Sequence, residues 1–256
     1  DWGVDFVKVD DIAASRLYDT HLDEIKLIRK AIDHCGRDMV LSLSPGPAPL
    51  EYAKDFIANA NMWRMTDDFW DLWDLLYNMF DRCYKWSKNV GPGHWPDADM
   101  LPLGHIGIRS VDGGASDRYT RFTKAEQVTM MTLWSIFRSP LMFGGELRDN
   151  DEWTLSLLTN EEVLEMHKYS HSARQVYRED EKVVWASQGD ESYYVALFNI
   201  GDITQKISVD FSQLDLPSSM PLQLRDLWKR EQLGSVSNQI SYELSPHSSI
   251  LLKIAL

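Results

Sequence analysis

Acidic side chains stand close to basic ones, or to each other, at three places in the first hundred residues of the sequence. The three groups are Lys8 with Asp10 and Asp11, Arg64 with Asp67 and Asp68, and Asp97 with Asp99. A carboxylate beside a cation stays ionised and can act as a nucleophile, whereas a partly buried carboxyl group keeps its proton and can act as an acid. Two such groups on either side of a sugar's anomeric carbon can hydrolyse a glycosidic bond. For any single group, a structural ion pair explains the residues equally well.

The residues around these groups alternate between strand and helix patterns. Helical spacing of apolar residues predicts helices over Thr20–Cys35, Leu50–Ala58 and Phe69–Trp86, and a capping box of Thr123 with Glu126 opens a further helix that ends at Phe137. Apolar runs predict strands within residues 1–11 and over Met39–Ser44, Asn61–Met65, His94–Leu101 and Pro140–Phe143. This order is typical of βα units around a parallel sheet. In a parallel barrel all strands end on one face, so the acidic groups are expected to converge there.

After residue 170 the pattern changes to short β-rich runs separated by turns. The runs are Lys182–Ala186, Tyr193–Asn199, Gln205–Val209, Leu222–Trp228, Gln239–Leu244 and Ser249–Ile254. We therefore expect an α/β domain over residues 1–170, part of a (β/α)8 TIM barrel, and an all-β antiparallel sandwich over residues 171–256. A complete barrel takes about 250 residues. Because only about five βα units are present here, the N-terminal units are expected to lie in a longer parent protein or in another chain or copy.

Composition limits the classes of partner. The formal net charge is −13 over 256 residues, and no basic patch stands out that could bind nucleic acid or an anionic membrane surface. No apolar run approaches the length of a membrane-spanning helix. Cys35 and Cys83 are expected to be free, buried thiols, with neither a disulfide nor a structural zinc site. Periplasmic or secreted destinations suit a glycan-degrading enzyme, and the sequence by itself establishes neither.

Four motifs resemble, in order, those of family 27 glycoside hydrolases, the α-galactosidase and α-N-acetylgalactosaminidase family. They are Trp2-Gly3-Val4-Asp5 followed by Lys8-Val9-Asp10, Trp63-Arg64 followed by Asp68, the run Gly93-His94-Trp95-Pro96-Asp97-Ala98-Asp99-Met100-Leu101, and the segment from Thr132 to Gly145 with Trp134, Arg138, Ser139 and Pro140. The resemblance covers nearly the whole chain. The motifs of the first domain are specific in combination, and the β domain adds a compatible architecture.

The resemblance implies a role for each site residue. It implies Asp10 as the nucleophile and Asp68 as the general acid/base, with Lys8, Arg64 and Asp99 binding the sugar hydroxyls. The implied mechanism is retaining and proceeds through a covalent glycosyl-enzyme, with no metal or organic cofactor. Asp67 competes with Asp68 for the acid role, but its match to the family is displaced by one residue. We expect Asp67 to cap the following helix instead.

The sequence departs from the family pattern in the region that would contact the sugar. Where the galactosidases have a glutamate, this chain has Ser44 followed by Pro45, so Ser44 is the candidate contact to the sugar's 2-substituent. Ala98 replaces a proline of the family motif, and Asp11 replaces a small or amide residue. The segment that selects an axial 4-hydroxyl belongs to the absent part of the barrel. An α-galactoside is the leading expected substrate, with an α-N-acetylgalactosaminide or a β-L-arabinopyranoside as alternatives.

Two interpretations from other classes stay open at this point. A metal-dependent barrel enzyme would use Asp10, Asp11, Asp97 and Asp99 as oxygen ligands for magnesium, with Lys8 as the base. A non-catalytic carbohydrate-binding remnant would explain an incomplete barrel whose strand edges are exposed. The carboxyl groups of Asp10 and Asp68 distinguish the hydrolase from both, since a retaining enzyme needs them about 5 to 5.5 Å apart.

Overall fold

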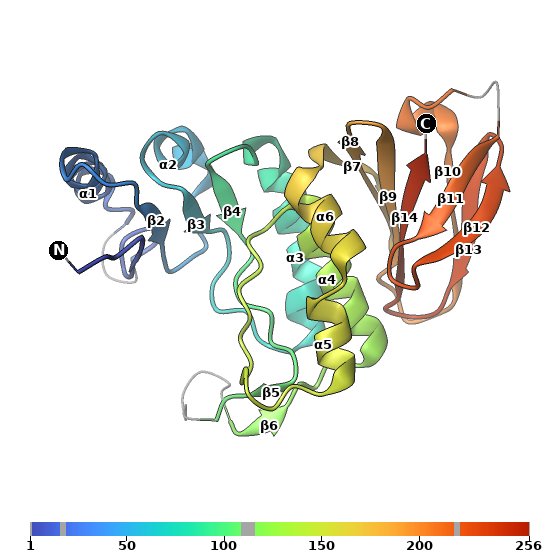
Figure 1. Cartoon of the computed structure of the whole chain (residues 1–256), viewed down its shortest axis with the longest axis horizontal. Coiled ribbons are helices and arrows are strands. Elements are labelled where there is room, and N and C mark those ends of the chain that lie inside the picture. Colours follow the sequence, from blue (N-terminus) through green and yellow to red (C-terminus); the bar gives the residue numbers. More distant parts are fainter. Residues whose placement is uncertain (1, 16–18, 109–115, 218–220, 256) are drawn as a thin grey trace. The chain divides into compact units, whose positions relative to one another are not determined.

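The computed structural model describes residues 2–15, 19–108, 116–217 and 221–255 (Figure 1). The chain divides into two compact units. The first comprises Asp1–Trp70, Asn78–Met100 and Ser139–Met142, and the second comprises Asp71–Tyr77, Leu101–Arg138 and Phe143–Leu256. In the part of the chain that the structure describes, no helix has the length and apolar character needed to cross a membrane.

A parallel sheet forms the centre of the first unit. In the described residues its strands are β1 (Phe6–Val9), β2 (Val40–Leu43), β3 (Met62–Arg64) and β4 (Trp95–Asp97), and they lie side by side in chain order (Figure 1). The register places Lys8 opposite Ser42 and Arg64 opposite Asp97. All four strands run in the same direction, so their C-terminal ends share one edge of the sheet.

Helices separate these strands as the apolar periodicity predicts. They are α1 (Leu22–His34), α2 (Ala53–Asn59), which follows a 3-10 turn at Leu50–Tyr52, and α3 (Trp73–Trp86), which precedes a 3-10 turn at Ser87–Asn89. The strand expected at Pro140–Phe143 is wrong in extent. An isolated parallel bridge between Leu101 and Phe143 is all that forms there, and Pro140 itself has no N–H to contribute to a ladder.

Trp63 of β3 anchors the core of the first unit. Its side chain is fully buried and stacks on Phe56 of α2, with ring centroids 5.6 Å apart. Trp86 at the end of α3 packs against the Trp63 ring, with ring centroids 5.8 Å apart. These contacts hold β3 between two helices, and so determine where the polar residues that follow the strand are placed.

Three helices and a short hairpin open the second unit. They are the hairpin strands β5 (His105–Ile106) and β6 (Arg118–Tyr119), and the helices α4 (Lys124–Phe137), α5 (Glu152–Leu158) and α6 (Glu161–Tyr169). Helix α4 is almost wholly buried, as its mostly apolar sequence requires. The capping box expected at its start is present, with Thr123 and Glu126 each bonding the other's backbone N–H.

The rest of the second unit is antiparallel β structure, as expected. In the described residues a six-stranded sheet has the order β12-β11-β14-β9-β8-β7, and β10 pairs with β13. The strands are β7 (His171–Glu179), β8 (Lys182–Gly189), β9 (Ser192–Asn199), β10 (Gln205–Asp210), β11 (Leu222–Asp226), β12 (Glu231–Val236), β13 (Gln239–Leu244) and β14 (Ser249–Ala255). Buried side chains from both sheets, including Val195 of β9 and Ile207 of β10, form one core. The fold class, an α/β barrel portion followed by a β sandwich, is confirmed.

Several further details differ from expectation, among them the state of one cysteine and two strands of the β structure. Cys83 is buried and Cys35 is exposed, so the expectation of two buried thiols is wrong for Cys35; both are free in the structure. Cys35 lies just beyond the last residue of α1, outside its buried face. Strands β7 and β12 were not expected, because the residues of both are partly or fully exposed throughout and carry no alternating apolar pattern.

Candidate active site

The predicted site residues all lie at the C-terminal ends of the four parallel strands. Lys8 belongs to β1 and Asp10 follows it, Ser44 follows β2, Arg64 ends β3 with Asp68 four residues on, and Asp99 follows β4. Since neighbouring parallel strands end at one edge, residues from four distant parts of the sequence are gathered there. Direct contacts or charge interactions connect five of these residues further, namely Asp10, Ser44, Arg64, Asp68 and Asp99.

Ser44 contacts Asp10 directly. The Ser44 hydroxyl donates a hydrogen bond of 2.5 Å to Oδ1 of Asp10. The backbone of Ser44 is held as well: its N–H donates to the carbonyl of Val9, and its carbonyl accepts from the N–H groups of Ile12 and Ala13. The end of β2 therefore positions both the loop after β1 and the carboxylate that this loop carries.

These surroundings favour the ionised form of Asp10. The hydrogen bond from Ser44 is the largest cause that lowers the pKa of Asp10, and the backbone N–H of Asp11 and the charges of Lys8 and Arg64 act in the same direction. Partial burial opposes them but does not outweigh them. Asp10 is consequently an exposed, anionic carboxylate at the strand ends.

Arg64 joins two further carboxylates of the group. One guanidinium nitrogen lies 3.1 Å from Oδ1 of Asp68, and the other lies 2.8 Å from Oδ1 of Asp99. The Arg64 side chain is buried, whereas the Asp68 side chain is 65% exposed. Arg64 thus holds Asp68 from below and leaves its carboxyl group open to solvent.

Asp99 and Asp97 lie deeper than Asp10 and Asp68. Burial raises the pKa of Asp99, although Arg64 and the backbone N–H of Phe69, which donates to Oδ2 at 2.7 Å, oppose this. Asp97 is 4% exposed, and its burial raises its pKa to about 6 despite the hydrogen bond from the N–H of Asp99. Asp97 is a titratable group under the site. Sequence reasoning named it among the acidic groups and in the metal alternative, but gave it no catalytic or sugar-binding role.

Two close contacts hold the loops around this edge. Any side chain at Gly46 would overlap the backbone of Thr66 and the carbonyl of Arg64, so glycine allows the loop after β2 to approach the end of β3. The Ser139 hydroxyl accepts a hydrogen bond of 2.9 Å from the N–H of Ala98, which lies between Asp97 and Asp99 in the chain. Sequence reasoning gave Ser139 no role. Its position just before a proline in the last barrel motif was the available signal.

Two other expectations concern Asp67 and a possible metal site. Asp67 accepts a hydrogen bond from the N–H of Asp68, and α3 begins only at Trp73, so Asp67 is not the expected helix cap. Within the described residues no cluster of three or more His, Cys, Asp and Glu side chains could hold a metal ion. Asp10, Asp11, Asp97 and Asp99 are therefore not gathered into a cluster of this kind.

The arrangement offers two carboxyl groups with distinct surroundings. Asp10 is ionised and exposed, which suits a nucleophile, and Asp68 is solvent-accessible beside a buried arginine, which suits proton exchange with a bound molecule.

Comparison with protein families matches both parts of the chain. Residues 1–168 match the model described as "Alpha galactosidase A", and residues 179–254 match the model described as "Alpha galactosidase C-terminal beta sandwich domain". Among curated proteins, α-galactosidase 2 of Arabidopsis thaliana is 28% identical over 96% of this chain and 59% of its own length. The α-galactosidase of Coffea arabica is 30% identical over 97% of this chain and 62% of its own length.

Some solved structures show higher identity. A GH27 β-L-arabinopyranosidase from Geobacillus stearothermophilus is 68% identical, with a TM-score of 0.97 over 100% of this chain and 58% of that one. A variant of the same enzyme has been solved in complex with arabinose. A putative α-N-acetylgalactosaminidase from Bacillus halodurans is 57% identical, with a TM-score of 0.85 over 99% of this chain and 58% of that one. The chain thus spans less than two thirds of the length of these relatives.

Proposed function

The chain belongs to family 27 of the glycoside hydrolases, with that family's C-terminal β domain, and from this premise we propose that the whole protein is a retaining exo-glycosidase. It removes a terminal sugar of galactose-like configuration from a glycan. The observation that carries the proposal is the Asp10 carboxylate, held ionised by Ser44 and the nearby cations at the edge where Asp68 and Asp99 also lie.

Each carboxyl group has its own step in the proposed reaction. Asp10 attacks the anomeric carbon and forms a covalent glycosyl-enzyme, while Asp68 gives a proton to the departing glycosidic oxygen. Asp68 then takes a proton from the water that hydrolyses the intermediate, and the sugar leaves with its original anomeric configuration. Lys8 and Asp99 bind sugar hydroxyls.

For Ser44 and Arg64 we propose roles other than the sugar contacts that the family resemblance implies. The Ser44 hydroxyl already donates to Asp10, so we propose that Ser44 orients the nucleophile, in addition to any contact with the sugar. Both terminal nitrogens of Arg64 are bound to carboxylates. We propose that Arg64 positions Asp68 for the proton transfer.

The relatives favour a β-L-arabinopyranoside as substrate. The relative that is 68% identical is named as a β-L-arabinopyranosidase, whereas the α-galactosidases compared above are 28% and 30% identical. β-L-Arabinopyranose has the ring configuration of α-D-galactopyranose and lacks only its hydroxymethyl group. An α-galactoside is the second candidate. A difference of one methylene changes specificity by about 10- to 200-fold, which sets the order of magnitude expected for a hydroxymethyl group.

A panel of aryl glycosides tests the substrate in the protein that carries the whole barrel. We expect kcat/KM for p-nitrophenyl β-L-arabinopyranoside to exceed that for p-nitrophenyl α-D-galactopyranoside by about tenfold or more. A clear preference for the galactoside would select the second candidate, and turnover of p-nitrophenyl α-N-acetylgalactosaminide alone would select the third. Absence of turnover with all three would contradict the proposed function.

Substitution of the two carboxyl groups tests the mechanism. Asp10→Ala should abolish turnover, and added azide should restore it with inverted product stereochemistry because azide replaces the nucleophile. Asp68→Ala should slow hydrolysis of poor leaving groups far more than that of a dinitrophenyl glycoside, which needs no protonation. Asp67→Ala is the matched control and should retain activity. Normal activity of Asp10→Ala would exclude Asp10 as the nucleophile.

A further inference from the structure

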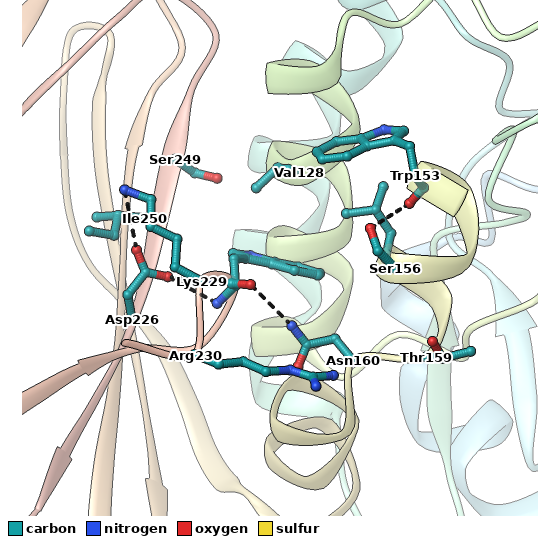
Figure 2. Close-up of a pocket in the computed structure, with 12 residues that line it drawn as sticks. Val128, Trp153, Ser156, Thr159, Asn160, Asp226, Lys229, Arg230, Ser249 and Ile250 are labelled. Atoms are coloured by element: carbon teal, nitrogen blue, oxygen red, sulfur yellow. Dashed lines mark hydrogen bonds and ion pairs between the residues drawn. The ribbon is translucent and has the colours of Figure 1, made fainter. Parts of the chain in front are cut away.

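The second unit contains a cavity that lies between helices and strands and includes none of the residues of the proposed active site. Its volume is about 590 Å³, and its walls come from α4, α5, the start of α6, the start of β14, and the end of β11 with the turn that follows it (Figure 2). Two tryptophans, Trp153 and Trp228, belong to the lining. A cavity of this size accommodates a ligand of a few sugar rings, since ligand pockets are typically about 300 to 1,000 Å³.

Both tryptophans are fixed by hydrogen bonds that use their indole N–H groups. Trp153 Nε1 donates to Oε1 of the buried Gln127 at 2.9 Å, and Trp228 Nε1 donates to Oγ1 of Thr132 at 2.8 Å. Both acceptors belong to α4. The Lys124 ammonium lies over the Trp153 ring, 4.7 Å from its centroid. Because the polar atoms of both indoles bond to the protein, the parts of these partly buried rings that line the cavity are aromatic carbon. Flat aromatic surface of this kind packs against the C–H faces of pyranose rings.

The turn that carries Trp228 is also held rigidly. The buried Asp226 accepts the N–H groups of Trp228 and Lys229 at 2.9 and 3.0 Å. Asn160, the N-cap of α6, donates to the carbonyl of Leu227 at 2.9 Å. Figure 2 shows Asn160 and Asp226 on either side of this turn. The cavity is therefore preorganised, which lowers the entropy lost when a ligand binds.

Polar groups surround the aromatic walls. Ser156 and Thr159 are exposed on the helical side; each hydroxyl donates to a carbonyl of its own helix and keeps lone pairs that can accept from a ligand. Lys229 and Arg230 are exposed on the opposite side, and Figure 2 shows Arg230 extending toward Asn160. Donors and acceptors thus flank two aromatic rings, which matches the alternating hydroxyl and C–H surfaces of a sugar.

We propose that this cavity is a non-catalytic binding site for a pyranose oligosaccharide, in which Trp153 and Trp228 pack against sugar rings and the polar rim bonds to their hydroxyls. The choice of a glycan as ligand rests on the proposed function. The site would hold the polymer from which terminal sugars are released, and would thereby raise the concentration of chain ends around the enzyme.

Affinity electrophoresis tests this site without any turnover. The protein with the whole barrel carries Asp10→Ala, and gels contain arabinogalactan or galactomannan together with excess L-arabinose to occupy the active site. We expect at least one of the two polysaccharides to retard the protein. Trp153→Ala should weaken this binding about tenfold, as expected for an aromatic anchor in a preorganised pocket. Tyr84→Ala, which removes an exposed aromatic ring of α3 outside the cavity, is the control and should bind as before.

A second variant separates lost binding from lost folding. Ser156→Arg fills the cavity from an exposed helical position and should abolish retardation while the thermal unfolding midpoint stays unchanged. Equal retardation of the parent and both cavity variants would overturn the inference, as would no retardation by either polysaccharide. Aryl-glycoside turnover is measured in a separate experiment. A failure of the proposed function would therefore not change the interpretation of the binding result.

Discussion

The Ser44 hydroxyl donates to the same carboxylate that we propose as the nucleophile. It is the largest of the causes that lower the pKa of Asp10. Ser44→Ala should therefore raise that pKa and move the acidic limb of the kcat/KM profile to higher pH, because the ionised form loses its best hydrogen bond. Ser44→Thr keeps a hydroxyl and should leave the limb in place. An unchanged limb in the alanine variant would show that Ser44 does not tune Asp10.

Asp97 makes the stability of the first unit depend on pH. Its pKa of about 6 in the folded protein lies above the usual value of 3.8, so its contribution to stability is complete below about pH 3.8 and is lost as the pH rises through 6. Asp97→Asn keeps an oxygen that can accept from the N–H of Asp99 and carries no charge. The variant should gain stability over the wild type between pH 3.5 and 7, by up to about 3 kcal/mol. Thermal unfolding of both proteins across this pH range measures the gain in stability. A gain that does not change with pH would contradict the raised pKa of Asp97.

Helix α4 shows how an element depends on its first turn. Thr123 and Glu126 bond each other's backbone N–H groups, and the helix that follows is buried along nearly its whole length and bonds both tryptophans of the cavity, through Gln127 and Thr132. Thr123→Ala should lower the free energy of unfolding by about 1 kcal/mol, the usual effect of losing an N-cap. Thr123→Ser should restore most of it. Chemical denaturation measures both, and equal loss in the two variants would indicate that the methyl group, not the cap, matters.

The whole chain exposes apolar side chains just before its first strand and at that strand's first residue. Trp2, Val4 and Phe6 are exposed, Phe6 by 41%, and β2 is the one neighbour of β1 among the described strands. Exposed strand edges with apolar residues favour association. This chain expressed by itself should therefore self-associate with increasing concentration in sedimentation experiments. Phe6→Lys should reduce this association, whereas Leu147→Lys, an exposed control outside the sheet, should not. A monomer at all concentrations would contradict this expectation.

The sequence predicted the elements around the site because their signals are local. Apolar periodicity located α1 and β2 to within a few residues, and the Thr123 capping box located the start of α4. The four sequence motifs, three of which carry acidic residues, identified the family when read together, before any geometry was available. Strand β7 and the 3-10 turn at Leu50 carried no such local signal, since partial exposure and tight turns are set by their neighbours.

The sequence by itself determined which residue types could do chemistry and the order in which strands would deliver them. Only the tertiary structure decided how they are paired: that Ser44 binds Asp10, that Arg64 holds Asp68 and Asp99, and that Asp97 lies buried beneath them. The physical reason is that strand register and burial act between residues far apart in the chain. A local pattern can place a carboxyl group at the end of a strand, but its partners and its pKa depend on what the folded sheet brings beside it.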